Sequence, residues 1–157
     1  RRIPRSSLEA IAAVDLLDAD RVFVAGRGRD GEFRTEGDSA DPGDGTWRPR
    51  ALGPSDSDAL QAIASRAPVV RAATSGSGEA HGSPSTSTMA LPIHVADQVV
   101  AVLVATRPAE RPPFGELERL VGDLLVTQIG VALHNADRHA TVSDAALRDR
   151  HAMPGRR

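Results

Sequence analysis

Histidine is the first residue type to consider for chemistry in this 157-residue chain. Its imidazole can ligate a metal or haem and can transfer protons near neutral pH. His94 alternates with apolar neighbours, so it faces opposite to them, toward a pocket or toward solvent. His134 and His139 are five residues apart in an expected helix and do not align on one face for a shared metal. Haem ligation by His81 or His94 is an alternative, but a solvated or hydrogen-bonded imidazole accounts for each of them.

The remaining reactive groups do not form a catalytic set. Ser87 and Thr88 stand in a segment filled with serine and threonine, so pairing them with a histidine is arbitrary. Glu116 and Glu118 lie at an expected helix N-terminus, where the helix dipole favours carboxylates without catalysis. Cysteine is absent, which excludes thiol catalysis, disulfides and thiolate metal sites. The sequence therefore predicts no enzyme.

Three further patterns resemble ion-binding sites only superficially. Residues 26–31, GRGRDG, lack the Lys-Ser/Thr ending and the following helix of a phosphate loop, so we expect a hairpin turn. The aspartates between residues 38 and 44 have the wrong spacing for a calcium loop. Arg107 and Arg111 flank a proline-rich connection, and we expect both to be exposed to solvent rather than to bind phosphate.

Composition limits the classes of partner. The formal net charge of −2 gives no electrostatic case for nucleic acid or an anionic membrane. Apolar residues at 40% and charged residues at 25% are globular values, the longest apolar run is too short to span a bilayer, and the N-terminus has no signal-peptide pattern. We therefore expect a cytoplasmic domain. The chain begins with Arg1 instead of Met, and we expect it to be a fragment of a longer protein.

The elements that position these residues follow from periodicity and turn signals. Residues 99–106 are apolar on both faces, which predicts a central strand covered by helices. A weaker helical pattern continues after Asn135 and stops at Pro154. In chain order we expect a helix at 6–18, strands at 21–25 and 32–35, a mobile loop at 37–53, a helix at 55–67, a strand at 68–72, a flexible segment at 73–88, strands at 89–95 and 99–106, and a helix from 114.

Three motifs follow one another in the second half of the chain. Ser87–Ile93 reads STMALPI, Val100–Leu103 reads VAVL, and a helix that starts with Pro113-Phe114 and Glu118 ends in ALHNA at residues 132–136. Their order and spacing resemble the GAF domain family over roughly residues 6–139. We therefore expect one domain at residues 1–139 and a helical extension at residues 140–157.

The resemblance implies an α+β fold of the GAF-like (PAS/profilin-like) type. An antiparallel sheet of five or six strands would carry the first and last helices on one face and the middle helix and loops on the other. GAF domains bind small molecules between the sheet and those loops, or dimerise, and pass a signal to an output domain. The absence of Lys and Cys argues against the cyclic-nucleotide, bilin and methionine-sulfoxide members of the family, and the sequence identifies no cofactor.

Our leading prediction is a non-catalytic regulatory domain of a bacterial signalling protein, such as a two-component system. It would form a homodimer through the first and last helices and relay a signal through residues 137–153 to a covalently linked output domain. The expected dimer face comprises Leu8, Ile11, Leu117, Val121, Leu125, Ile129 and Leu133. The alternative is a small-molecule sensor with a pocket beneath the 73–88 lid, lined by Val24, Val70, Thr74, Ser87, Met89, Leu91 and His94.

Overall fold

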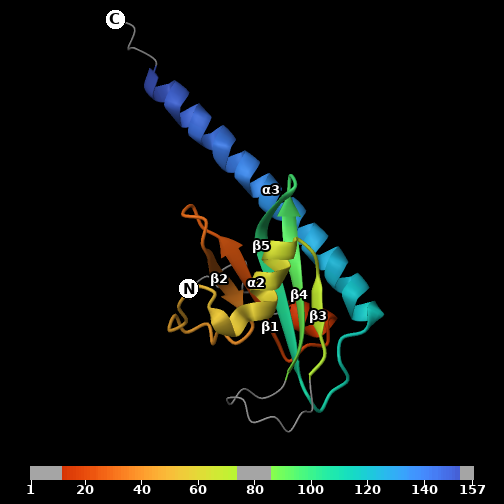
Figure 1. Ribbon diagram of the computed structural model, residues 1–157. Helices are drawn as coiled ribbons and strands as arrows, with labels where there is room; N and C mark the ends of the chain where they lie inside the picture. Colours follow the sequence, from red (N-terminus) through yellow and green to blue (C-terminus); the bar gives the residue numbers. More distant parts are fainter. Residues whose placement is uncertain (1–11, 74–85, 153–157) are drawn as a thin grey trace, which may run out of the picture.

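The computed structural model describes residues 12–73 and 86–152 and is built around an antiparallel sheet (Figure 1). Its five strands lie in the order β2-β1-β5-β4-β3. The expected α+β class and antiparallel sheet are thereby confirmed. The strands are β1 (Arg21–Arg27), β2 (Phe33–Asp38), β3 (Val69–Arg71), β4 (Thr86–Val95) and β5 (Gln98–Pro108), and the helices are η1 (Pro54–Asp56), α2 (Ser57–Ser65) and α3 (Glu116–Ala152), with a first helix described over residues 12–16.

The central strand is β5, as its two apolar faces predict, and it pairs with β1 on one side and β4 on the other. Strand β4 begins at Thr86, three residues before the expected start at Met89. Thr86, Ser87 and Thr88 were expected to be part of a flexible segment, but they pair with β5 residues of the ladder. Because β5 is three residues longer than expected and ends at Pro108, it offers these residues backbone partners that composition alone does not reveal.

Two apolar cores lie on the two faces of the sheet. One face is covered by the first helix and α3, and the other by α2 (Figure 1). The helical layer rests on Val22, Val24, Met89, Leu91, Ile93, Leu103 and Phe114, among others. The opposite core is made by Phe23, Ala25, Ala59, Ala62, Ala90, Val102 and Val104. This arrangement agrees with the layers that the resemblance implied.

Helix α3 contains 37 residues and is continuous, so the expected weaker pattern after Asn135 belongs to the same helix. Its C-terminal half extends away from the sheet (Figure 1). Two glycines let its N-terminal half approach β4 closely. A Cβ at Gly122 would lie 2.5 Å from Leu91 Cδ1, and one at Gly130 would lie 2.9 Å from the His94 carbonyl oxygen. The glycines therefore fix which side of α3 faces the sheet.

The loop after β2, which we expected to be mobile, is attached to the domain by arginine–carboxylate pairs. Asp38 forms a two-pronged ion pair with Arg21. Arg50 forms another with Asp56, at 2.7 and 2.9 Å, and its guanidinium lies over the Phe23 ring. The Thr35 hydroxyl accepts a hydrogen bond from the Arg50 backbone N–H at 2.9 Å. These contacts tie both ends of the predicted mobile loop to the domain, because bidentate pairs fix side-chain geometry.

Candidate functional site

Helix α3 has a second apolar side that faces away from the sheet. Leu117, Leu120, Leu124 and Val131 are 72%, 63%, 67% and 57% exposed. At about 100° per residue, the four side chains fall within an arc of about 60°. We call these four residues the outer row. Large apolar side chains left on one line in this way are typical of an interaction surface.

The outer row continues beyond the sheet. Val142 lies within the same arc about seven turns after Leu117 and is also exposed. In the same helical layer, Leu16 of the first helix is 57% exposed. The apolar surface therefore extends from the part of α3 that packs on the domain to the part that projects from it.

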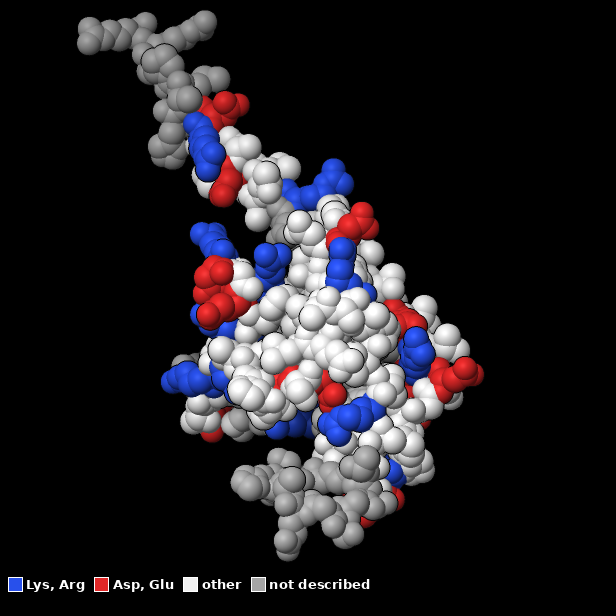
Figure 2. All heavy atoms as spheres, in the orientation of Figure 1, with Lys and Arg blue, Asp and Glu red and all other residues white. Residues whose placement is uncertain are grey.

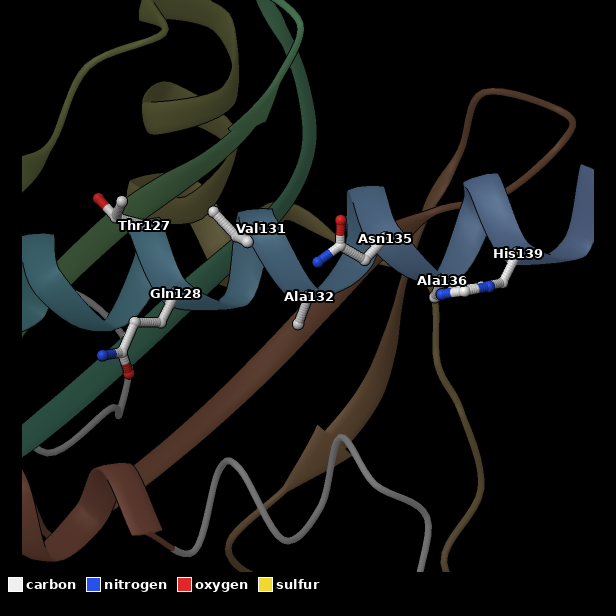
Figure 3. A pocket seen from close by; sticks show the side chains of 7 residues that line it. All are labelled: Thr127, Gln128, Val131, Ala132, Asn135, Ala136 and His139. Atoms are coloured by element: carbon white, nitrogen blue, oxygen red, sulfur yellow. The ribbon is translucent and has the colours of Figure 1, made fainter.

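Two shallow depressions adjoin Val131. One, of about 470 Å³, is lined by side chains of α3 between Thr127 and His139 (Figure 3). The other, of about 440 Å³, lies between α3 and the end of β4 and includes His94 and His134. Thr127 and Val131 line both of them. Hollows on either side of a protruding apolar side chain can receive side chains from an opposing helix.

A buried arginine joins the helical layer to the sheet at the other end of α3. Arg107, the penultimate residue of β5, is 3% exposed. Its guanidinium donates hydrogen bonds to the carbonyl oxygens of Leu17 and Asp18, both at 2.9 Å, and to Glu118 Oε1 at 3.0 Å. It also lies 4.3 Å from the centroid of the Phe114 ring. The expectation that Arg107 is exposed to solvent is therefore wrong.

Glu118 completes this junction from the first turn of α3. Its second carboxylate oxygen accepts a hydrogen bond from the Gly115 backbone N–H at 3.0 Å. Its own backbone N–H, and then the Arg107 guanidinium, hold the pKa of the Glu118 carboxyl below its ordinary value. On the surface, Arg111 pairs with Asp18 at 2.6 Å. Arg111 is half-buried, so the prediction that it is exposed is also wrong in part.

Sequence comparison identifies the family to which this scaffold belongs. The model of the GAF domain family matches residues 7–133, most of the chain. The chain belongs to the GAF domain family. Among curated proteins, none matches it.

Solved GAF domains share its fold. The second GAF domain of DevS from Mycobacterium smegmatis is 26% identical, with a TM-score of 0.66 over 87% of this chain and 96% of that one. The GAF domain of a two-component sensor histidine kinase from Bacillus halodurans is 15% identical, with a TM-score of 0.62 over 86% and 99%. The GAF domain from an Acinetobacter phosphoenolpyruvate-protein phosphotransferase is 13% identical, with a TM-score of 0.68 over 85% and 82%.

The residues predicted for the dimer face of this GAF domain differ in how accessible they are, and dimerisation through them stays a prediction. Val121, Leu125 and Leu133 pack against the core of the helical layer, and Ile129 is buried within it. Of the expected α3 residues only Leu117 is exposed, and Leu8 and Ile11 lie outside the described residues. The reason is geometric: a row in steps of four turns by about 40° at each step and reaches the sheet. The outer row is the accessible apolar side.

The described members of the predicted ligand-binding set lie in different parts of the fold. Val24, Met89 and Leu91 form part of the packed core beneath α3, on the sheet face opposite to α2. Val70 pairs with Met89 in the ladder and is exposed at the sheet edge. Ligand binding by these residues stays a prediction.

The other members of that set are scattered. Ser87 is buried, and its hydroxyl accepts a hydrogen bond from the Ala73 backbone N–H at 3.0 Å. His94 is exposed and lines the second depression, whereas Thr74 and the alternative haem ligand His81 lie outside the described residues. Across the described ranges, no group of three or more His, Asp or Glu side chains could hold a metal ion.

Charged residues of both signs are interspersed on the face that carries α2. Figure 2 shows this face with a largely uncharged middle and with basic and acidic side chains next to one another at its rim. Several of them are paired, including Arg71 with Asp58 at 2.8 Å. In the part of the chain that the structure describes, no helix is both long and apolar enough to cross a membrane.

Proposed function

We propose that this GAF domain is a non-catalytic regulatory module that forms a parallel homodimer through α3 and relays a signal along that helix to an output domain. The observation that carries the proposal is the outer row of exposed apolar side chains, which lies opposite the side that packs on the sheet. A second copy of α3 would remove these side chains from water, and each fully buried leucine-sized side chain contributes about 1.5–3 kcal/mol.

The shape of α3 supports a second copy of the chain as the partner. Its C-terminal half projects from the domain (Figure 1), where a single helix gains little from tertiary packing. Leu117, Leu120 and Leu124 are separated by steps of three and four, and Val131 follows seven residues later. This spacing is typical of the seam between paired helices. Pairing would therefore stabilise both the outer row and the projecting half of α3.

The continuity of α3 supports the relay. The same uninterrupted helix contacts β4 and extends to Ala152, so a shift of its N-terminal half on the sheet carries its far end with it. Two solved structures with this fold are named as the GAF domain of a sensor histidine kinase and as the second GAF domain of DevS. A parallel pair would direct both copies of α3 toward output domains on one side.

The proposal is tested by sedimentation velocity over a range of protein concentrations. The wild-type chain should reach the mass of a dimer as its concentration rises. The variant Leu120→Glu/Leu124→Glu should stay monomeric, because carboxylates cannot be buried in an apolar seam without a partner. Leu60→Glu is the matched control, since Leu60 is an exposed leucine on α2, and it should dimerise like the wild type. A wild-type chain that is monomeric at every concentration would contradict the proposal.

A further inference from the structure

The junction around Arg107 joins two helix ends of opposite polarity. The carbonyl oxygens of Leu17 and Asp18 terminate the first helix, where a helix carries partial negative charge. Glu118 stands in the first turn of α3, where a helix carries partial positive charge. The cation of Arg107 therefore stabilises the end of one helix, the anion of Glu118 stabilises the start of the other, and the two charges contact each other.

The contacts come from segments that are distant in sequence. Arg107 is separated from the first helix by about ninety residues and from Glu118 by eleven. The same guanidinium donates to the carbonyl oxygens of Pro112 and Pro113, at 3.2 and 3.4 Å, in the connection that leads to α3. A planar guanidinium with five N–H donors can hold all of these groups at once, whereas an ammonium cannot match that geometry.

We propose that Arg107 and Glu118 form a latch that fixes the first helix and α3 to one another at the end of β5. The start of α3 shifts on the sheet only when the end of the first helix is released with it. The latch lies within one chain, so it operates whether or not the domain dimerises. It goes beyond the proposed relay by naming the contact through which a movement of β5 reaches both helices.

Burial distinguishes this pair from the surface ion pairs of the domain. The Arg107 side chain is 4% exposed and that of Glu118 is 26% exposed, so solvent screens their interaction weakly. The neighbouring Arg111–Asp18 pair has an aspartate that is 77% exposed, and such pairs contribute little. Removing the Glu118 charge would leave the buried arginine with neutral carbonyl oxygens and with the exposed Asp18 carboxylate at 3.9 Å. The loss of the closer, less exposed anion weakens the hold of Arg107 on both helix ends.

The absence of cysteine permits a direct distance measurement. Asp15→Cys and Asp123→Cys place one nitroxide label on the exposed side of each helix, and pulsed electron paramagnetic resonance reports the distance between them. Dilution with unlabelled protein removes distances between copies. Glu118→Gln should broaden the distance distribution or add a second population. Glu116→Gln removes an exposed carboxylate from the same helical turn and should leave the distribution unchanged.

Hydrogen exchange supplies a second readout in the same variants without the labels. In Glu118→Gln, the backbone amides of residues 17–20 and 119–122 should exchange faster together, while those in the middle of β4 and β5 keep their protection. Arg107→Lys, which retains the charge but loses the planar fork, should show the same paired loosening. An unchanged distance distribution in folded Glu118→Gln would overturn the latch. Faster hydrogen exchange at the start of α3 without faster exchange at the end of the first helix would also overturn it.

Discussion

Gly122 of α3 lies directly against Leu91 of β4. A Cβ at position 122 would be 2.5 Å from Leu91 Cδ1 and 3.4 Å from Met89 Cε. Leu91 and Met89 are fully buried, so neither side chain can move into free space. The side of α3 that carries Gly122 is therefore set against the sheet, and this contact determines the orientation of the outer row on the opposite side.

Gly122→Ala should destabilise the domain although alanine favours helices. In an exposed helix the substitution would add up to about 1 kcal/mol of stability. Here overpacking should outweigh that gain, with a net loss of about 1–3 kcal/mol. Urea unfolding of the wild type and the variant measures the difference. An increase in the free energy of unfolding would show that α3 does not rest on Leu91 as described.

The two apolar sides of α3 should respond differently to truncation. Ile129→Ala removes a buried side chain from the core and should cost about 2–5 kcal/mol of folding stability. Leu124→Ala removes an exposed side chain and should change the stability of the monomer by less than about 0.5 kcal/mol. Thermal unfolding at low protein concentration separates the two effects. Equal losses of stability would mean that α3 is rotated about its axis relative to the structure.

Protonation of the Asp38 carboxylate should make the domain less stable in acid. Burial alone would raise the pKa of its carboxyl, but hydrogen bonds from Arg21 and the Ala40 backbone N–H, with the nearby arginine charges, hold the pKa below its ordinary value. The pKa of Asp38 is lower in the folded state than in the unfolded state. Its carboxylate therefore contributes to folding stability above the unfolded-state pKa of about 3.9, and this contribution is lost as the pH falls through the folded-state pKa.

Asp38→Asn isolates this contribution. At pH 7 the variant should be less stable by about 1–3 kcal/mol, because Arg21 loses a charged partner. Between pH 5 and pH 2 its stability should fall less steeply than that of the wild type, since it has no carboxylate to protonate at this position. Urea unfolding at each pH measures both slopes. Asp123→Asn, at an exposed position on α3, should keep the steeper wild-type slope.

Periodicity predicted the architecture because long apolar patterns dominate it. The run that became β5 is apolar on both faces, and a strand of that kind has to be central. The short gap between the strands expected at 89–95 and 99–106 is a turn in the structure, and Ala96 and Asp97 adopt left-handed backbone there, with φ values of 48° and 66°. Local patterns of this kind need no knowledge of distant contacts.

The candidate functional site could not be predicted from the sequence pattern, because it depends on contacts between residues that are distant in sequence. Arg107 follows an apolar strand and precedes prolines, which gives no sign that carbonyl oxygens about ninety residues away will surround it. The sequence shows that α3 is broadly apolar but does not show which row meets the sheet. Gly122 and Gly130 held the available signal, because they lie about 80° apart around the helix, within the half that meets the sheet, and each permits a close approach to β4.

Disulfide cross-linking along α3 tests the parallel dimer most directly, since the chain has no cysteine of its own. Leu117→Cys and Val142→Cys lie on the outer row and its continuation, roughly 37 Å apart at 1.5 Å per residue. In a parallel pair each cysteine meets its own copy across the symmetry axis, so each variant alone should form a covalent dimer under mild oxidation.

Asp144→Cys provides the control, because residue 144 lies on the opposite side of α3 from Val142. It should stay monomeric under the same conditions. A parallel dimer through the outer row should give efficient cross-linking of Leu117→Cys and Val142→Cys and little of Asp144→Cys, read from the mass of the oxidised protein. No cross-linking at either outer position, or equal cross-linking at all three, would contradict a parallel pairing of α3.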